Sequence, residues 1–234
     1  MDESLSFFLS IAPTLLAAVP VTLTLTFFSA LIGNTLAVPI AVASLSSNPL
    51  LRFPSAFYIF VVRGTPLLAQ TYLIYYGLGE LLPGTLIQKS FLWPYLRDGF
   101  WYAIFAFSLN TAGYTGEILR GAIMAVPKGE IEAARAYGFS KGLIFWRVTL
   151  PRAIQICLPT MTGETILLLK ATSLASLITV WEVMGTARQI QKVTFRVYEP
   201  LIAAGLLYIV MVFILTRLMM IVERRINRHR LAPV

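Results

Sequence analysis

The chain has 234 residues, a length that fits one domain or two small ones. Hydrophobic residues make up 57% of it, charged residues only 13%, and the mean hydropathy is +0.76. Soluble domains carry about 25% charged residues, so the composition excludes an ordinary soluble domain, a disordered chain and a coiled coil. Formal charges are absent from 4–51, 64–79, 99–116 and 200–216. Because a membrane-spanning helix needs about 20 mostly apolar residues, the sequence predicts an all-α, polytopic membrane protein.

Five spans are predicted within a single transmembrane domain, residues 1–234, and they cover about 14–43, 54–79, 99–125, 152–170 and 200–222. The second span is interrupted by the sequence Arg63-Gly64-Thr65-Pro66. Residues 80–98 are expected to form a mixed loop with a short helix at the membrane interface, where the amphipathic rings of Trp93 and Tyr95 are favoured. Residues 171–199 form a second, semi-polar connection.

The net charge of +8 is explained by membrane topology rather than by nucleic acid. Lys and Arg collect in the cytoplasmic loops of membrane proteins. If the N-terminus lies outside, twelve of them fall in cytoplasmic segments and five in outer loops. We therefore expect the N-terminus outside and the C-terminus in the cytoplasm, in a bacterial inner membrane. No basic groove with interleaved aromatic residues is present, so no nucleic-acid partner is expected.

The composition disfavours a catalytic site or a metal site in this chain. The single cysteine, Cys157, excludes an intramolecular disulfide. One cysteine and one histidine, His229, also exclude a structural zinc site of the usual kind. The N-terminus lacks a basic segment, so no cleaved signal peptide is expected. We expect no catalytic residue, no metal site and no cofactor bound by this chain.

The longest polar segment, 127–151, predicts a short cytoplasmic helix between two spans. Glu130 and Glu132 suit the first turn of this helix, where the helix dipole favours carboxylates. Strong helix formers with small side chains follow, namely Ala133, Ala134 and Ala136. Gly138 suits the left-handed conformation that ends a helix. Its small and charged face indicates a helix that docks into a groove of a partner protein.

This segment resembles the EAA motif of the membrane subunits of ABC importers. Glu132-Ala133-Ala134, Gly138 and Leu150-Pro151 match the motif at its spacing, and Val148 stands where the motif has Ile. Elsewhere, Arg63-Gly64-Thr65-Pro66 and 110–117 look like the polar amino-acid permeases. Gly129 to Ser140 is similar to the histidine, lysine/arginine/ornithine and opine permease subunits.

The resemblance implies a type I ABC importer transmembrane domain that moves an amino acid, namely a basic amino acid, histidine or an opine. It implies a separate ATPase dimer that carries ATP and Mg²⁺, an extracytoplasmic amino-acid-binding protein, and a second homologous permease subunit. A heterodimer of permease subunits is favoured over a homodimer. The EAA segment would be the coupling helix, with ATPase-docking residues Glu132, Ala133, Ala134, Arg135, Tyr137, Gly138 and Phe139.

Polar residues inside the spans are candidates for the substrate path, because ionisable groups in a membrane tend to be functional. Asn110, Tyr114 and Glu117 share one helical face at i, i+4 and i+7. That face indicates either path lining or hydrogen bonds between helices. The remaining candidates are Gly64, Thr65 and Gln70 in the second span and Glu164 and Lys170 in the fourth.

Three other functions are less consistent with the sequence than a permease. A self-contained secondary transporter or channel is disfavoured because no inverted repeat is apparent in the sequence. A membrane-embedded enzyme would need clustered catalytic groups or metal ligands. A structural subunit that moves nothing is disfavoured by the polar stripe at 110–117. The chain contains no Gly-x-x-x-x-Gly-Lys-Ser/Thr phosphate loop, so we expect ATP hydrolysis to reside in a partner rather than here.

Overall fold

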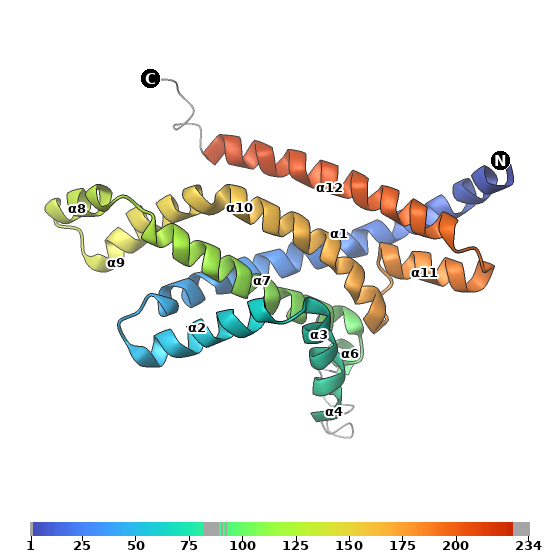
Figure 1. The fold of residues 1–234 in the computed structure, drawn as a ribbon, viewed down its shortest axis with the longest axis horizontal. Coiled ribbons are helices and arrows are strands. Elements are labelled where there is room, and N and C mark those ends of the chain that lie inside the picture. The colour runs from blue at the N-terminus through green and yellow to red at the C-terminus, as the bar shows by residue number, and fades with distance from the viewer. Residues whose placement is uncertain (1, 82–88, 90, 92, 227–234) are drawn as a thin grey trace.

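The computed structural model describes residues 2–81, 89, 91 and 93–226, and these residues contain helices but no strand. Long helices run side by side along the longest axis of the molecule (Figure 1). They are α1 (Asp2–Ser44), α2 (Pro49–Gly64), α7 (Gly99–Met124), α10 (Leu150–Ala171) and α12 (Tyr198–Ile226). The predicted all-α class is confirmed. Residues 227–234, which include Arg228, His229 and Arg230, lie outside the described part.

The predicted count of five spans is not confirmed. Within the described residues, three helical stretches are long and apolar enough to cross a membrane, and they are Glu3–Ser44, Lys141–Ile178 and Tyr198–Ile226. A bent pair, Pro49–Gly64 with Leu67–Gly77, makes a fourth if it counts as one span. The helix α7 is not in this group, although its 26 residues reach about 39 Å at about 1.5 Å per residue.

The low apolarity of α7 follows from its central position. It packs against α1, α2 and α10, and half of its residues are buried, among them Phe107, Ala112 and Thr115. A helix that neighbouring helices shield from lipid does not need an apolar surface all round. The polar stripe on α7 is partly buried and borders two cavities between this helix and its neighbours.

The predicted interruption of the second span, 54–79, at Arg63-Gly64-Thr65-Pro66 is confirmed, whereas the sharp change of direction there was not predicted. The helix α2 ends at Gly64, and the chain bends by 108° before α3 (Leu67–Tyr72), the π-helical turn η1 (Leu73–Gly77) and α4 (Leu78–Leu81). Pro66 causes the break, because it disfavours the helical conformation of the preceding residue and has no N–H to donate. Thr65 is accordingly extended, with φ −118° and ψ 146°.

Several predicted boundaries also shift. The helix α1 begins at Asp2 rather than near residue 14, and Pro13 lies inside it without ending it. The fourth span begins earlier than predicted, since α9 (Lys141–Ile144) and the π-helical turn η2 (Phe145–Thr149) lead directly into α10. The expected short helix is α6 (Trp93–Leu96), whereas 82–88, 90 and 92 of that loop lie outside the described residues.

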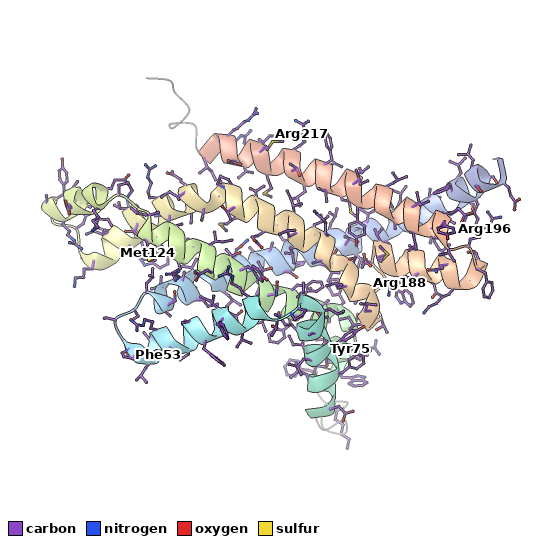
Figure 2. All side chains as sticks on the ribbon, viewed as in Figure 1. Phe53, Tyr75, Met124, Arg188, Arg196 and Arg217 are labelled. Carbon is purple, nitrogen blue, oxygen red and sulfur yellow. The ribbon has the colours of Figure 1, made fainter. Side chains whose placement is uncertain are left out.

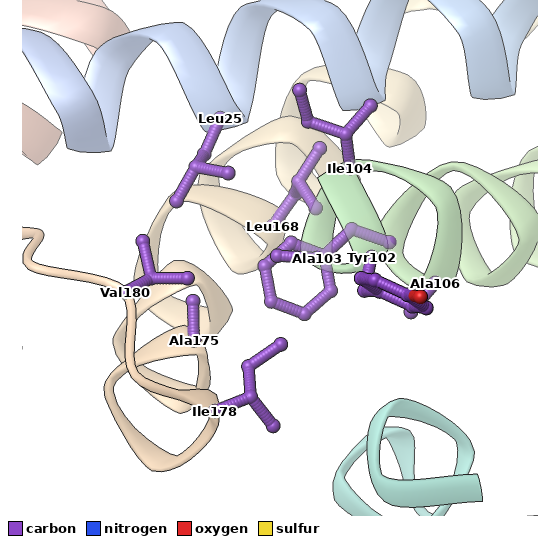
Figure 3. Packing of buried hydrophobic residues seen from close by; sticks show 10 residues of the cluster. Leu25, Tyr102, Ala103, Ile104, Ala106, Leu168, Ala175, Ile178 and Val180 are labelled. Atoms are coloured by element: carbon purple, nitrogen blue, oxygen red, sulfur yellow. The ribbon is translucent and has the colours of Figure 1, made fainter. Parts of the chain in front are cut away.

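One of the buried hydrophobic clusters lies where α1, α7 and the end of α10 meet, and it fixes the orientation of α7. Leu25 of α1 and Leu168 of α10 face Ala103 and Ile104 of α7 across this cluster (Figure 3). Below them lies the 3₁₀ helix η3 (Thr172–Ile178), which contributes Ala175 and Ile178. This packing holds α7 with its polar face toward α2 and α10. That face forms one wall of the candidate site.

Candidate functional site

The predicted coupling helix is α8 (Lys128–Ala136), at one end of the molecule (Figure 1). Glu130 lies in its first turn, as expected from the helix dipole, whereas Glu132 lies in the second turn because the helix begins earlier, at Lys128. The Glu130 carboxylate forms an ion pair with the Nε of Arg152 in α10, at a distance of 3.1 Å. The coupling helix is therefore tied to a membrane helix as well as to its own loop.

The end of α8 is fixed by Gly138, which has φ +78°. The Gly138 N–H donates to the carbonyl of Arg135 at 2.8 Å, and the Phe139 N–H donates to the carbonyl of Ala134 at 3.1 Å. These two bonds make a Schellman motif, in which glycine is favoured because it has no Cβ to strain the left-handed conformation. The prediction that Gly138 ends this helix is confirmed.

Most of the predicted docking residues lie on the surface. Tyr137 is 85% exposed and Phe139 is 41% exposed, and the other exposed members are Glu132, Ala133, Arg135 and Gly138. Ala134 differs, because only 8% of it is exposed. Its small side chain lets α8 pack closely on the chain itself, so Ala134 supports the helix rather than offering surface to a partner.

A cavity of about 330 Å³ lies beside the break in the second span. It separates the start of α3 from α7 and α10, and Thr65, Asn110, Tyr114 and Glu164 are in its wall. The structure thus brings together four candidates that lie up to 99 positions apart in the sequence. The side chain of Glu164 contributes a carboxylate to this wall.

Gln70 connects the broken helix to the polar stripe. Its Oε1 accepts a hydrogen bond from the Asn110 amide at 3.0 Å. Its Nε2 donates to the carbonyl of Val62 at 2.8 Å and to the Thr65 hydroxyl at 2.8 Å. Carbonyls freed by the break are therefore satisfied by a side chain, as a membrane protein requires. This arrangement holds the break against the middle of α7.

The rest of the stripe faces Arg63. The Arg63 guanidinium lies 5.8 Å from the centre of the Tyr114 ring and 4.0 Å from the Glu117 carboxylate. Glu117 also accepts from Arg120 at 2.6 Å, so its charge is neutralised locally. It faces a second cavity of about 300 Å³, with Arg52 and Arg120.

Three candidates are separated from the first cavity. Glu117 lies in the wall of the second cavity. Lys170 is exposed, and neither Lys170 nor Gly64 is in the wall of the first cavity. Lys170 and Glu164 are both on α10, but they point in different directions because they are six residues apart. The structure therefore gathers Thr65, Gln70, Asn110, Tyr114 and Glu164 into one site.

Residues 33–228 match the family of binding-protein-dependent transport system inner membrane components. This chain belongs to that family. It is therefore a membrane-embedded transporter subunit, and the family resemblance and transport function expected from the sequence are confirmed.

Similar proteins support this assignment over nearly the full length. The octopine transport system permease protein OccM of Rhizobium meliloti is 46% identical, over 89% of this chain and 84% of OccM. The nopaline permease protein NocM of Agrobacterium fabrum is 46% identical over 95% and 91%. The histidine/lysine/arginine/ornithine permease protein HisM of Salmonella typhimurium is 39% identical over 90% and 89%.

Solved structures share the fold of this inner membrane component. A chain of an amino acid ABC transporter crystallised with histidines superposes with a TM-score of 0.80 at 33% identity, covering 94% of this chain and 97% of that one. A chain of the methionine transporter MetNI, in an inward-facing conformation, superposes with a TM-score of 0.74 at 18% identity, covering 93% and 98%. The latter supports the fold alone.

One structural feature of this permease component was not predicted, namely the buried carboxylate of Glu182, which is 0% exposed. It caps α11 (Val183–Thr194) by accepting from the Gly185 N–H at 2.7 Å. It also accepts from the hydroxyls of Tyr208 in α12, at 2.6 Å, and Thr22 in α1, at 3.4 Å. Burial raises the pKa of Glu182, while these donors oppose the rise. The sequence signal was a lone acid three residues before a glycine.

Proposed function

We propose that this chain is the permease subunit of an ATP-driven importer for an amino acid with a cationic side chain, histidine or an opine. The observation that carries the proposal is the exposed coupling helix α8, which presents Glu132 and Tyr137 to a partner and ends in a glycine-dependent motif. ATP and Mg²⁺ bind to the partner ATPase, and the exposed residues of α8 form the surface on which that ATPase docks.

The structure supports a mechanical route from α8 to the cavity. The ion pair between Glu130 and Arg152 joins α8 to α10, and α10 carries Glu164 in the cavity wall. The helical run from Lys141 to Ile178 includes α10, so a displacement of α8 would move the cavity wall with it. ATP drives transport only if it stabilises one arrangement of the subunits over the other.

Substrate class and orientation are part of the same proposal. The names of the relatives, which are permeases for opines and for basic amino acids, favour a substrate with a cationic group. The carboxylate of Glu164 complements such a group. The helix α8 and the C-terminal end of α12 both lie on the side of the molecule away from the N-terminus (Figure 1). Because α8 would face the cytoplasmic ATPase, this arrangement supports a cytoplasmic C-terminus and an outside N-terminus. We propose a heterodimer with a second, homologous permease subunit.

Docking is tested by coexpressing the chain with its ATPase. We expect Gly138→Asp to reduce copurification of the ATPase and transport-coupled ATP hydrolysis at least tenfold. An aspartate side chain disfavours φ +78° and adds negative charge at the end of the helix, where the dipole disfavours it. The measurement is the ATPase retained on a tagged permease, with size-exclusion profiles to check folding.

Gly142→Asp is the matched control, because a Cβ at Gly142 meets nothing within 4 Å and lies near the start of α9, where a carboxylate is favourable. It should copurify the ATPase normally. Equal copurification by both variants would show that α8 is not the coupling element. Uptake by this chain without any ATPase would instead favour a secondary transporter.

The substrate class is tested at Glu164. Replacing it with glutamine removes the charge but keeps the shape, so we expect uptake of a cationic amino acid to fall about tenfold or more, as for loss of a charged contact of about 1.5–3 kcal/mol. Uptake is measured in proteoliposomes containing the full complex. Glu80→Gln, at an exposed acid on α4, is the control. Unchanged uptake by the Glu164 variant would remove this residue from the path.

A further inference from the structure

The end of the molecule opposite α8 carries another concave surface, which is separate from the two cavities described above. It is a cup of about 820 Å³ formed by α11 and the segments on either side of it, with Trp181, Arg188, Lys192 and Phe195 in its wall. Figure 2 shows Arg188 and Arg196 at this end and Met124, near α8, at the other. In the proposed orientation, the cup opens outside the cell.

The cup is built on a rigid base. Val183 and Ala187 are fully buried in the cluster that joins α11 to α1 and α12. The Glu182 carboxylate fastens the first turn of α11 to Tyr208 and Thr22. The opposite face of α11 is thereby held outward and is available to a partner.

That outward face is basic. Arg188 and Lys192 are exposed and lie four residues apart on one side of α11. Neither forms an ion pair with another residue in the described part of the chain. Arg196, by contrast, is paired with Glu3 at 2.6 Å and Glu199 at 3.3 Å. Two cations therefore remain for an external anionic surface.

Exposed aromatic side chains flank these cations. Trp181 is 57% exposed and Phe195 is 89% exposed. Phe195 has φ 58°, and Thr179 in the cup wall has φ 64°, a conformation that is uncommon for a β-branched residue. Strained backbone persists where surrounding structure holds it and is concentrated at functional sites. Aromatic residues and arginine together are typical of the centres of protein interfaces.

We infer that this cup is the docking surface for an acidic patch on the extracytoplasmic binding protein of the same transport system. The inference rests on the proposed function, including its orientation. Gln189 and Gln191 add hydrogen-bonding groups to the wall, which suit a protein surface. A cavity between α1, α10 and α12 has a wall of mainly Leu, Phe and Met, as expected for contact with lipid chains, and the cup differs from it.

Charge reversal tests the inference. The complete complex is placed in nanodiscs of neutral lipid, and binding of the amino-acid-loaded binding protein is titrated. We expect the double variant Arg188→Glu/Lys192→Glu to weaken binding about tenfold or more, and the wild-type affinity to fall with salt, because both effects follow from charge complementarity. Arg224→Glu/Arg225→Glu, at the other end of α12, is the matched control and should bind normally.

Labelling gives an independent readout, because Cys157 is buried and is the single cysteine of the chain. A Lys192→Cys variant should react with a membrane-impermeant maleimide from outside, and the binding protein should block the reaction. Unchanged binding by the charge-reversed variant would overturn the inference. So would a cysteine that is already blocked without binding protein, because lipid or the second permease subunit would then cover the cup. Retained copurification of the ATPase would show that the proposed function survives either result.

Discussion

Replacing Glu182 with alanine is expected to lower the free energy of unfolding by about 2–4 kcal/mol, because buried donors that lose their acceptor each cost about 1–3 kcal/mol. The Gly185 N–H and the Tyr208 hydroxyl would lose their closest partner, and α11 would lose its cap. The effect should be seen as a lower midpoint of thermal unfolding of the purified subunit in detergent.

Two variants separate the contribution of these hydrogen bonds from that of charge. Glu182→Gln keeps one carbonyl acceptor for Gly185, so it should lose less than half as much stability as the alanine variant. Tyr208→Phe removes one donor and should have an intermediate effect. Glu80→Ala, at an exposed acid, should leave the midpoint unchanged. A Glu182→Ala midpoint equal to that of wild type would show that the carboxylate does not hold α11.

Replacing Gly99 with alanine is expected to destabilise the protein by about 1–3 kcal/mol, the usual cost of overpacking a close contact. Gly99 is buried at the start of α7, and a Cβ there would overlap the carbonyl oxygen of Ile178 in η3. A backbone oxygen cannot move aside as the end of a flexible side chain can. The measurement is again the unfolding midpoint in detergent.

The matched control is another glycine of the same helix. A Cβ at Gly121 would meet nothing within 4 Å, so alanine fits there and raises helix propensity by up to about 1 kcal/mol. Gly121→Ala should therefore be neutral or slightly stabilising. Similar effects of the two substitutions would mean that the α7–η3 contact is looser than the structure shows.

Local patterns were sufficient to predict the coupling helix. The carboxylates at its start, the alanines and Gly138 all lie within one loop, and each acts through backbone geometry or the helix dipole. The face of α8 that packs on the chain was not predicted, because the burial of Ala134 depends on where the rest of the chain runs. The start of α1 and the size of the 108° bend were likewise missed, although the position of the bend was predicted.

The sequence by itself determined the membrane class, the family and the presence of the short helix α8, because uncharged stretches and a spaced motif are local properties of the chain. Only the tertiary structure decided which polar residues share a site. It joined Gln70 to Asn110 and placed Glu164 in the same cavity wall as Asn110, while Glu117 was paired with Arg120. It also brought Glu182 between α1 and α12. Such contacts depend on how helices cross and rotate against one another, and side-chain packing between distant segments sets that geometry.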